Sequence, residues 1–376
     1  MPTRLLYVVS HPIQYQVPLL RLIAADPAID LHVVFESGHS LGAFHDRGFG
    51  RRIAWDTELQ AGYDWSVLAG SADLRRRIKA ADAVWLHGWD SRARLEVLGC
   101  RRPLGVPILM RGENNDVSMP DGGGLRGALK RRILSWIFRR CDRFLCIGSD
   151  NRDYYRSRGI AEDRLFLMPY AVDNAHFRTL ADEAAATATG FRRALDIAEG
   201  RPVVLFAGKL QARKHPRELL AAFATLDRVA LGDPVLLFVG DGEERAALEA
   251  EAQPLGEAVR LLGFRNQSEL PAFYGLADVF VLASSREPWG LAVNEAMNAG
   301  TAVIVSDQCG CAADLVTPDS GVVVPAGRPA PLAAALANLL ADPVRCAAMG
   351  AAARRRVDGW DFRADIAGLK AALASL

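Results

Sequence analysis

Short apolar runs alternate with helical patterns along the whole chain. In the first half the runs span residues 5–10, 31–36, 83–86, 107–110, 144–147 and 165–169. The second half repeats the arrangement with runs at residues 203–207, 235–239, 259–262, 279–283, 302–306 and 322–325. Apolar strands that alternate with helices are typical of parallel sheets covered on both faces. The pattern therefore predicts an α/β protein of two Rossmann-like, doubly wound domains that face each other across a cleft.

The rhythm breaks at residues 178–200, an Ala- and Thr-rich stretch without periodicity. We place the hinge there, which gives an N-terminal domain over residues 1–185 and a C-terminal domain over residues 186–358. A chain of 376 residues with 50% hydrophobic residues is long enough for two such cores.

Charge and targeting signals narrow the function classes. The 45 basic and 44 acidic residues nearly cancel, so whole-protein charge gives no reason to expect nucleic acid as a partner. The first apolar run is too short for a signal peptide, and no stretch approaches the roughly 18 apolar residues of a membrane span. The six cysteines lack the spacing of a zinc site. We expect a cytoplasmic protein with free thiols.

Polar residues follow the predicted strands, where ligands bind in such sheets. In the first half they are His11, His87, Asp90, Arg111 and Glu113, and in the second half Gly208, Lys209, Gly240, Gly242 and Glu287. Two such sets suit an enzyme that joins two substrates.

The segment 284–300 combines two acids with the start of a helix. Glu287 lies on the loop after a strand, Gly290 and Leu291 present amides at a helix N-terminus, and Glu295 lies about one turn further on. Helix N-termini attract anions. Carboxylates beside an anion site suit a ligand with hydroxyls and a phosphate, as in a sugar nucleotide. Two alternatives remain at this point: Glu287 as a covalent nucleophile, and Glu295 as a surface helix residue.

A glycine and two lysines open the second domain. Gly208 allows close approach of the backbone, and Lys209 and Lys214 could grip a diphosphate from two sides, with Arg213 as a third cation. The alternative is a solvated basic loop.

These motifs together resemble the retaining GT-B glycosyltransferases of family 4, the glycosyl transferases group 1. The resemblance rests on the Gly208–Lys214 motif, on Gly240-Asp-Gly242-Glu-Glu-Arg245, and on Glu287-x7-Glu295 inside Glu-Pro-Trp-Gly-Leu-Ala-Val-Asn-Glu-Ala-Met. It covers the second domain, and residues 10–18 and 169–173 extend it into the first.

The resemblance implies a role for each matching residue on the donor side. Lys209 and Lys214 match the pair on the donor diphosphate, Glu287 the acid that holds sugar hydroxyls, and Glu295 the acid that binds the ribose. The remaining donor-side positions are the amides of Gly290 and Leu291 near the phosphates, the turns at Gly208, Gly240 and Gly242, and the backbone at Phe264 near the base. Retention of anomeric configuration is implied by the family, as is a last helix, in residues 359–376, that packs back on the N-terminal domain.

Two ammonium groups and a helix dipole can stabilise a leaving diphosphate without a metal. Paired acids such as Asp-x-Asp are absent from the strand ends. We therefore expect no metal and no cofactor beyond the nucleotide diphosphate sugar itself.

The first domain departs from the family pattern. A His-Pro-Ile-Gln loop at residues 11–14 replaces the early Gly-Gly turn, and Arg111-Gly-Glu113 stands where many members carry a histidine. Catalytic candidates are Glu287, Lys209 and Lys214 on one side, with His11 and Arg111 on the other. The acceptor-side candidates are His11, Gln14, His87, Asp90, Arg111 and Glu113. The alternatives are structural histidines and an Arg111–Glu113 pair.

Residues 125–144 predict a basic amphipathic helix. Such helices can lie on anionic membranes, and this one and the basic run at residues 75–79 are candidate docking surfaces for a lipid-linked acceptor at the inner face of the membrane. The alternative is a core-packed helix with a solvated basic face.

The sequence thus predicts transfer of a sugar to an acceptor hydroxyl, in polysaccharide, glycolipid or other glycoconjugate biosynthesis. It names neither the acceptor nor the oligomeric state. The alternatives are a nicotinamide oxidoreductase, for which a Gly-x-Gly-x-x-Gly turn is missing, a non-enzymatic two-lobed sugar-binding protein, and a phosphorylase or epimerase.

Overall fold

The chain folds into two compact units. A computed structural model describes residues 1–187 and 189–376. Unit 1 consists of Met1–Phe44, Thr57–Tyr170 and Phe362–Leu376, and unit 2 of His45–Asp56 and Ala171–Asp361.

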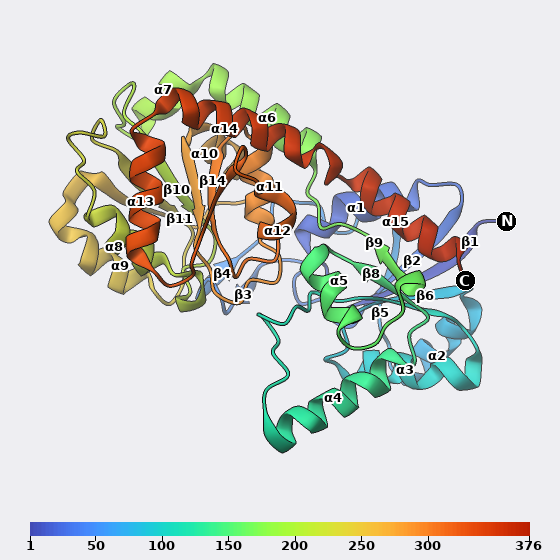
Figure 1. Ribbon diagram of the computed structural model, residues 1–376. Coiled ribbons are helices and arrows are strands. Elements are labelled where there is room, and N and C mark those ends of the chain that lie inside the picture. Colours follow the sequence, from blue (N-terminus) through green and yellow to red (C-terminus); the bar gives the residue numbers. More distant parts are fainter. The chain divides into compact units, whose positions relative to one another are not determined.

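Unit 1 is built on a seven-stranded sheet in the order β5-β2-β1-β6-β7-β8-β9, with parallel pairing throughout. Most of its strands are labelled in Figure 1. Its strands are β1 (Thr3–Val9), β2 (Ile29–Phe35), β5 (Asp64–Val67), β6 (Ala83–His87), β7 (Ile108–Arg111), β8 (Arg143–Cys146) and β9 (Leu165–Leu167). The central strands are buried along their length because both faces of the sheet are covered.

Six helices accompany this sheet. They are α1 (Val17–Ala24), α2 (Ser71–Ala80), α3 (Arg92–Leu104), α4 (Gly124–Phe138), α5 (Ser149–Arg156) and α15 (Phe362–Ala374). The last of them, α15, contacts β8, β9 and α1. Gly368 lets α15 lie close to β9, since a Cβ atom there would meet the carbonyl oxygen of Leu167 at 1.9 Å. The chain therefore ends in the unit in which it begins.

Unit 2 holds a six-stranded parallel sheet in the order β12-β11-β10-β13-β14-β15. Its strands are β10 (Val203–Ala207), β11 (Val235–Val239), β12 (Val259–Gly263), β13 (Val279–Leu282), β14 (Ala302–Ser306) and β15 (Gly321–Val324). Its helices are α6 (Asn174–Ala186), α7 (Ala188–Ala194), α8 (Pro216–Ala224), α9 (Arg245–Ala252), α10 (Leu270–Leu276), α11 (Leu291–Asn298), α12 (Ala312–Leu315), α13 (Pro329–Leu340) and α14 (Pro343–Arg356).

The predicted fold class is confirmed, since both units are doubly wound parallel sheets. Every apolar run that the sequence marked as a strand forms one, with ends that differ by a residue or two. The pattern missed β5 and a small hairpin of β3 (Phe44–Asp46) and β4 (Arg51–Ile53). These strands are half-exposed and polar, so they carry no apolar run.

The division between the units differs from the predicted hinge at residues 178–200. That stretch contains α7 and most of α6, and the units separate after Tyr170. Helix α6 packs inside unit 2, where the Phe177 ring lies 6.3 Å from that of Tyr274 and Arg178 Nε donates to Asn298 Oδ1 at 2.8 Å. Helix α6 buries few apolar side chains, so its apolar periodicity is too weak to be read from the sequence.

No single helix in the described part of the chain combines the length and hydropathy of a membrane span. Only the sharply bent pair Pro329–Leu340 and Pro343–Ala374 meets those criteria, on length and composition alone.

Candidate active site

The turns after β10 and β11 in unit 2 fit together only because they carry glycines. A Cβ atom at Gly240, where φ is +140°, would lie 1.8 Å from the carbonyl oxygen of Gly208. A Cβ atom at Gly242, where φ is +153°, would lie 2.5 Å from the carbonyl oxygen of Leu210. Backbone contacts this close require glycine. They bring the predicted donor-side loops together at the carboxyl edge of the sheet.

Glu287 and Lys214 form the centre of this edge. Lys214 Nζ donates to Glu287 Oε2 at 2.6 Å, and Arg213 Nη1 lies 3.1 Å from the same oxygen. The Glu287 backbone is fixed as well, because its amide donates to Gln308 and its carbonyl accepts from Gly310. The preceding Arg286 has a φ of +54°, a conformation that costs energy for a side chain of this kind. The Glu287 carboxylate is therefore held between two cations, the largely buried Lys214 and the exposed Arg213.

Glu295 is buried on α11, so the structure excludes the alternative of a surface helix residue. Tyr274 Oη donates to its carboxyl group at 2.6 Å, and Gln267 Nε2 donates at 3.0 Å. Burial raises the pKa of Glu295 to about 7, although both hydrogen bonds oppose the rise. A small change in surroundings or in pH can therefore change its charge near neutrality.

Helix α11 begins beside Glu287. Gly290 caps it in the left-handed region with a φ of +102°, and Leu291 is its first residue. A Cβ atom at Gly290 would lie 2.8 Å from a methyl group of Leu282. Trp289, which directly precedes Gly290, is fixed through its indole nitrogen, which donates to Asn294 at 2.9 Å. The amides of Gly290 and Leu291 are thus held in place at the same edge.

Lys209 and Phe264 contact residues 46–55, a segment that the sequence did not connect with the donor site. Lys209 Nζ contacts both carboxylate oxygens of Asp46 at 3.0 Å. The Phe264 ring contacts Phe49 and Trp55, with centroids 4.9 and 6.2 Å away. The Lys209–Asp46 contact joins residues that are more than a hundred positions apart in the sequence. Motif spacing along the chain gives no signal for such a contact.

The cysteines near Glu287 have no reactive character. All six are free and buried. Burial raises the pKa of the Cys309 thiol to about 11 and that of Cys311 further. Among the described residues, no three His, Cys, Asp or Glu side chains gather in a way that could hold a metal ion.

Unit 1 brings two of the acceptor-side candidates together at the ends of β6 and β7. His87 Nε2 lies 3.7 Å from Glu113 Oε1, and His87 Nδ1 lies 2.9 Å from Tyr7 Oη. Tyr170 and Tyr15 also donate to Glu113. Burial acts to raise the pKa of Glu113, but the contacts with His87 and Tyr170 outweigh it and leave the pKa below its usual value. The result is a carboxylate surrounded by donors.

Arg111 is buried in unit 1 and pairs with a residue of α15. Its guanidinium is 2% exposed, contacts Asp365 Oδ2 on α15 at 3.2 Å, and donates to the carbonyl of Met168 at 3.1 Å. It also lies 4.8 Å from the centre of the Tyr170 ring. In place of the Arg111–Glu113 pair, which the sequence left as an alternative, the structure has an Arg111–Asp365 pair.

The other acceptor-side candidates make contacts of their own. His11 Nδ1 lies 2.9 Å from Ser10 Oγ, and its ring lies 4.4 Å from that of His39. Asp90 is 81% exposed and pairs with Arg94 at 2.6 Å. Gln14 begins a short 3-10 turn that ends at Gln16, whose Oε1 accepts from Tyr7 at 2.9 Å.

Helix α4 exposes the apolar residues that a core-packed helix would bury. Its exposed apolar side chains are Leu125, Leu129, Ile133 and Trp136, with exposed fractions of 91%, 60%, 50% and 36%. The exposed cations beside them are Arg126, Arg131 and Arg132. Leu134, Ile137 and Phe138 form the opposite, buried face. One apolar face of α4 thus packs in unit 1, as the core-packed alternative expects, while a second apolar stripe is exposed.

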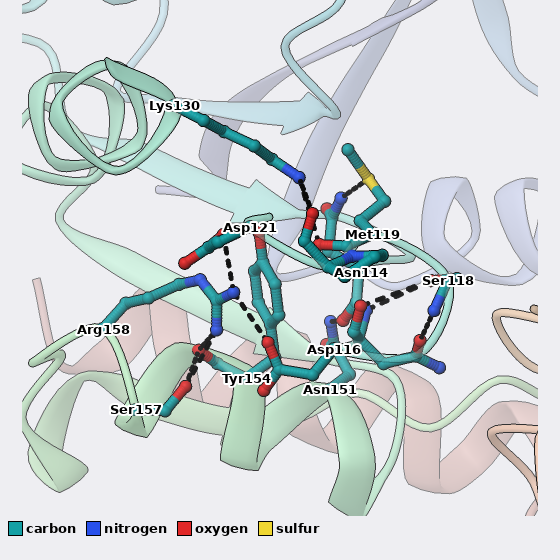
Figure 2. Close-up of polar contacts among 12 residues, drawn as sticks. Asn114, Asp116, Ser118, Met119, Asp121, Lys130, Asn151, Tyr154, Ser157 and Arg158 are labelled. Carbon is teal, nitrogen blue, oxygen red and sulfur yellow. Dashed lines mark hydrogen bonds and ion pairs between the residues drawn. The ribbon is translucent and has the colours of Figure 1, made fainter. Parts of the chain in front are cut away.

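The loop before α4 is tied to the body of unit 1 by ion pairs and hydrogen bonds (Figure 2). Arg158 contacts Asp116 at 2.7 Å and Asp121 at 2.9 Å, and its guanidinium lies 3.4 Å from the Tyr154 ring centre. Lys130 of α4 donates to the carbonyls of Met119 and Pro120. These contacts fix the base of α4 while its apolar stripe stays exposed.

Comparison with known proteins agrees with this architecture. Residues 188–356 match the family model described as Glycosyl transferases group 1. Among solved structures, Anabaena Alr3699/HepE in complex with UDP superposes with a TM-score of 0.77 and 16% identity over 100% of both chains. A sucrose-phosphate synthase from Thermosynechococcus elongatus gives 0.70 and 20% identity, covering 99% of this chain and 97% of that one. At these identities the likeness shows the shared GT-B fold.

Curated relatives point the same way. A D-inositol 3-phosphate glycosyltransferase of Salinispora tropica is 32% identical over 210 residues, which are 53% of this chain and 44% of the relative. A glycogen synthase of Mycobacterium tuberculosis is 28% identical over 307 residues, 78% of this chain and 70% of the relative. The chain thus spans less than half the length of the Salinispora relative. The family model matches residues of unit 2 alone, and the likeness to solved structures extends the GT-B fold over the whole chain.

Proposed function

We propose that the protein transfers a sugar from a nucleotide diphosphate sugar to an acceptor hydroxyl. The observation that carries this proposal is the cluster of Lys214, Glu287 and the start of α11 at the carboxyl edge of unit 2. Ammonium groups and helix N-terminal amides bind phosphates, and a fixed carboxylate accepts hydrogen bonds from sugar hydroxyls. One cluster thus offers partners for both halves of a sugar nucleotide.

In this scheme the donor diphosphate lies on Lys209, Lys214 and the amides of Gly290 and Leu291. When the bond between the sugar and the phosphate breaks, negative charge grows on the leaving diphosphate. Positive groups held in place before the reaction stabilise that charge most in the transition state. Glu287 holds the sugar hydroxyls and keeps Lys214 in position, while Glu295, in its ionised form, accepts from the ribose hydroxyls.

The finer features of the proposal follow family 4 of the glycosyltransferases. They are retention of anomeric configuration, a hexose as the transferred sugar, and catalysis in which the lysines and α11 take the part that a metal plays elsewhere. Salts of Mn²⁺ or Mg²⁺ that restore activity lost in a chelator would contradict the last of these.

On the acceptor side we propose Glu113 and His87 as the groups that orient the acceptor hydroxyl. Both belong to the polar cluster at the ends of β6 and β7, and Glu113 is poised to accept a hydrogen bond. Glu113→Gln is expected to slow sugar transfer and leave nucleoside diphosphate binding unchanged. Transfer at the wild-type rate would remove Glu113 from this role.

We also propose that α4 docks on an anionic membrane surface at the cytoplasmic face, which suits a lipid-linked acceptor in glycolipid, polysaccharide or glycoconjugate biosynthesis. The support is its exposed apolar stripe flanked by arginines.

A panel of sugar nucleotides tests the proposal as a whole. UDP-, GDP- and ADP-sugars are compared first by thermal shift and then by mass spectrometry of the products. One donor is expected to raise the melting temperature and to release its nucleoside diphosphate. A sugar-binding protein would be stabilised but release no nucleotide, and an oxidoreductase would need no sugar nucleotide. An isolated sugar phosphate or an epimerised donor among the products would indicate a phosphorylase or an epimerase.

A further inference from the structure

Residues 45–56 come from the first half of the sequence but fold with unit 2. The segment holds most of the two-stranded β3–β4 sheet, and it contacts the loops that follow β10, β11 and β12. Its contacts with unit 2 are Asp46 with Lys209, Arg51 with Asp241, Ala54 with Asn266, Asp56 with Ser268, and the rings of Phe49 and Trp55 with Phe264. Of these partners in unit 2, Lys209 is the cation proposed for the diphosphate.

The turn at residues 46–49 encloses the Lys209 side chain. Both oxygens of Asp46 lie 3.0 Å from Nζ, and the Phe49 ring centre lies 4.9 Å from the same atom. The Lys209 stem runs against Gly48, where a Cβ atom would meet its Cδ at 2.6 Å. A carboxylate, an aromatic face and a bare stretch of backbone thus cover three sides of one ammonium group.

Asp46 is fixed in this position by its own turn. Its Oδ1 atom accepts from the amide of Gly48 at 2.7 Å and from that of Phe49 at 3.0 Å. Burial acts to raise the pKa of Asp46, but the hydrogen bonds from Lys209 and these amides lower it overall, so the group is ionised at neutral pH. Lys209 is therefore already neutralised by an anion that is built into the chain.

A phosphate oxygen and the Asp46 carboxylate cannot share Lys209 without cost. Two anions on one ammonium repel each other, and the repulsion is larger in a partly buried site than in water. Asp46 is 13% exposed. The same segment has further attachments, through Arg51, Ala54 and Asp56, that do not involve Lys209. Release of the Asp46 end from Lys209 therefore does not require release of the whole segment.

We propose that residues 45–56 form a cap on the donor site, in which the Asp46 carboxylate competes with the donor diphosphate for Lys209. Donor binding displaces the Asp46 end of the cap, while its β4 end stays attached. This inference rests on the proposed donor site and adds to it a residue, Asp46, that sets how tightly phosphate-bearing ligands bind.

Calorimetric titration of three proteins tests the competition. The proteins are wild type, Asp46→Asn and Asp56→Asn, and the probes are UDP, GDP and ADP with their matching nucleosides. Asparagine keeps the side-chain oxygen that accepts from Gly48 and Phe49, so the turn is retained while the charge is removed. Asp56→Asn is the matched control, because it removes the same charge from the same segment without touching Lys209.

The Asp46→Asn variant is expected to bind the accepted nucleoside diphosphate roughly two- to fivefold more tightly, the range for loss of one partly exposed ion pair. Its affinity for the nucleoside, which has no phosphate, is expected to stay the same. Asp56→Asn is expected to change both affinities by less than about twofold, as surface substitutions usually do. Unchanged or weaker binding of the diphosphate by Asp46→Asn would overturn the inference and make Asp46 a group that positions Lys209.

Hydrogen exchange of the wild-type protein gives a second, independent measurement. Amides in residues 46–50 are expected to exchange faster when the accepted nucleoside diphosphate is added, and slower exchange there would overturn the inference. If the diphosphate binds but the cap does not respond, the donor site stands and the cap alone fails. If none of the three nucleoside diphosphates binds any of the proteins, the proposed donor site fails and the cap with it.

Discussion

Lys214 Nζ lies 2.6 Å from Glu287 Oε2, and this contact joins two loops that are 73 residues apart in the sequence. Both side chains are largely buried, with exposed fractions of 14% and 10%. The pair therefore fixes the position of the carboxylate and of the ammonium group at once. The proposed ligands are a sugar hydroxyl for Glu287 and a phosphate for Lys214.

Removal of the Lys214 ammonium is expected to weaken binding of the diphosphate selectively. In Lys214→Ala, the dissociation constant for the accepted nucleoside diphosphate should rise roughly tenfold or more, the cost of one charge-assisted hydrogen bond. The nucleoside without phosphates should bind as before. Titration calorimetry measures both, with Lys370→Ala as the control, since Lys370 is an exposed lysine of unit 1 paired with Asp26. Equal weakening of nucleoside and diphosphate would show a general loss of structure instead.

The residues of the proposed donor site could be grouped from the sequence because each lies after an apolar run or at the start of a helix. Gly208, Lys209, Glu287 and Gly290 all stand at such positions, and the structure places them at one sheet edge. Asp46 could not be found this way, since it lies in a polar hairpin that folds with a unit distant in sequence. The same holds for the Arg111–Asp365 pair, whose partners are 254 residues apart. Local patterns report neighbours along the chain, and these contacts depend on the tertiary fold.

The raised pKa of Glu295 predicts a pH dependence of nucleotide binding. The ionised carboxylate accepts hydrogen bonds from ribose hydroxyls better than the protonated form, so affinity should rise as pH passes through about 7. The nucleotide phosphate also titrates in this range. The measured quantity is therefore the ratio of the affinities of wild type and Glu295→Gln, followed from about pH 5.5 to about pH 8.5, on both sides of the pKa of Glu295. A ratio that stays constant over this range would contradict the role of Glu295.

The same group affects stability with a defined sign. Its pKa in the folded protein, about 7, is above the ordinary glutamate value of 4.5, so the folded state holds the proton more tightly than the unfolded state. The stabilisation it contributes is complete below the unfolded pKa and is lost as pH rises through the folded pKa. Chemical denaturation should therefore show a fall in the free energy of unfolding between these two values that is smaller in Glu295→Gln.

The buried Arg111–Asp365 pair is expected to hold α15 on unit 1. Asp365→Ala leaves an uncompensated buried guanidinium, which costs about 3–5 kcal/mol. Denaturant unfolding measures the loss in free energy of unfolding, and hydrogen exchange of the α15 amides shows whether this helix is loosened. Lys370→Ala, on the same helix but in an exposed pair, should cost less than about 1 kcal/mol. The double variant Arg111→Met with Asp365→Leu should recover most of the stability, and it should leave nucleoside diphosphate binding unchanged.

The exposed stripe of α4 predicts binding to anionic vesicles. The double variant Leu129→Glu with Ile133→Glu should abolish sedimentation with phosphatidylcholine vesicles that contain phosphatidylglycerol, because it places acids on the docking face. The control, Val229→Glu with Val344→Glu, makes the same change at two exposed valines of unit 2 and should sediment like wild type. Sedimentation that is the same for both double variants would remove the membrane role of α4.

The most direct measurement is sugar transfer by Glu287→Gln. Glutamine has nearly the same shape as glutamate but gives Lys214 and Arg213 no charge to pair with, and it holds sugar hydroxyls less strongly. With the donor that the wild-type protein uses, release of the nucleoside diphosphate should slow by roughly 100-fold or more, the usual effect of removing one positioned polar group from an active site. Wild-type release by this variant, or release from no UDP-, GDP- or ADP-sugar by the wild-type protein, would contradict a glycosyl transfer site built on Glu287 and Lys214.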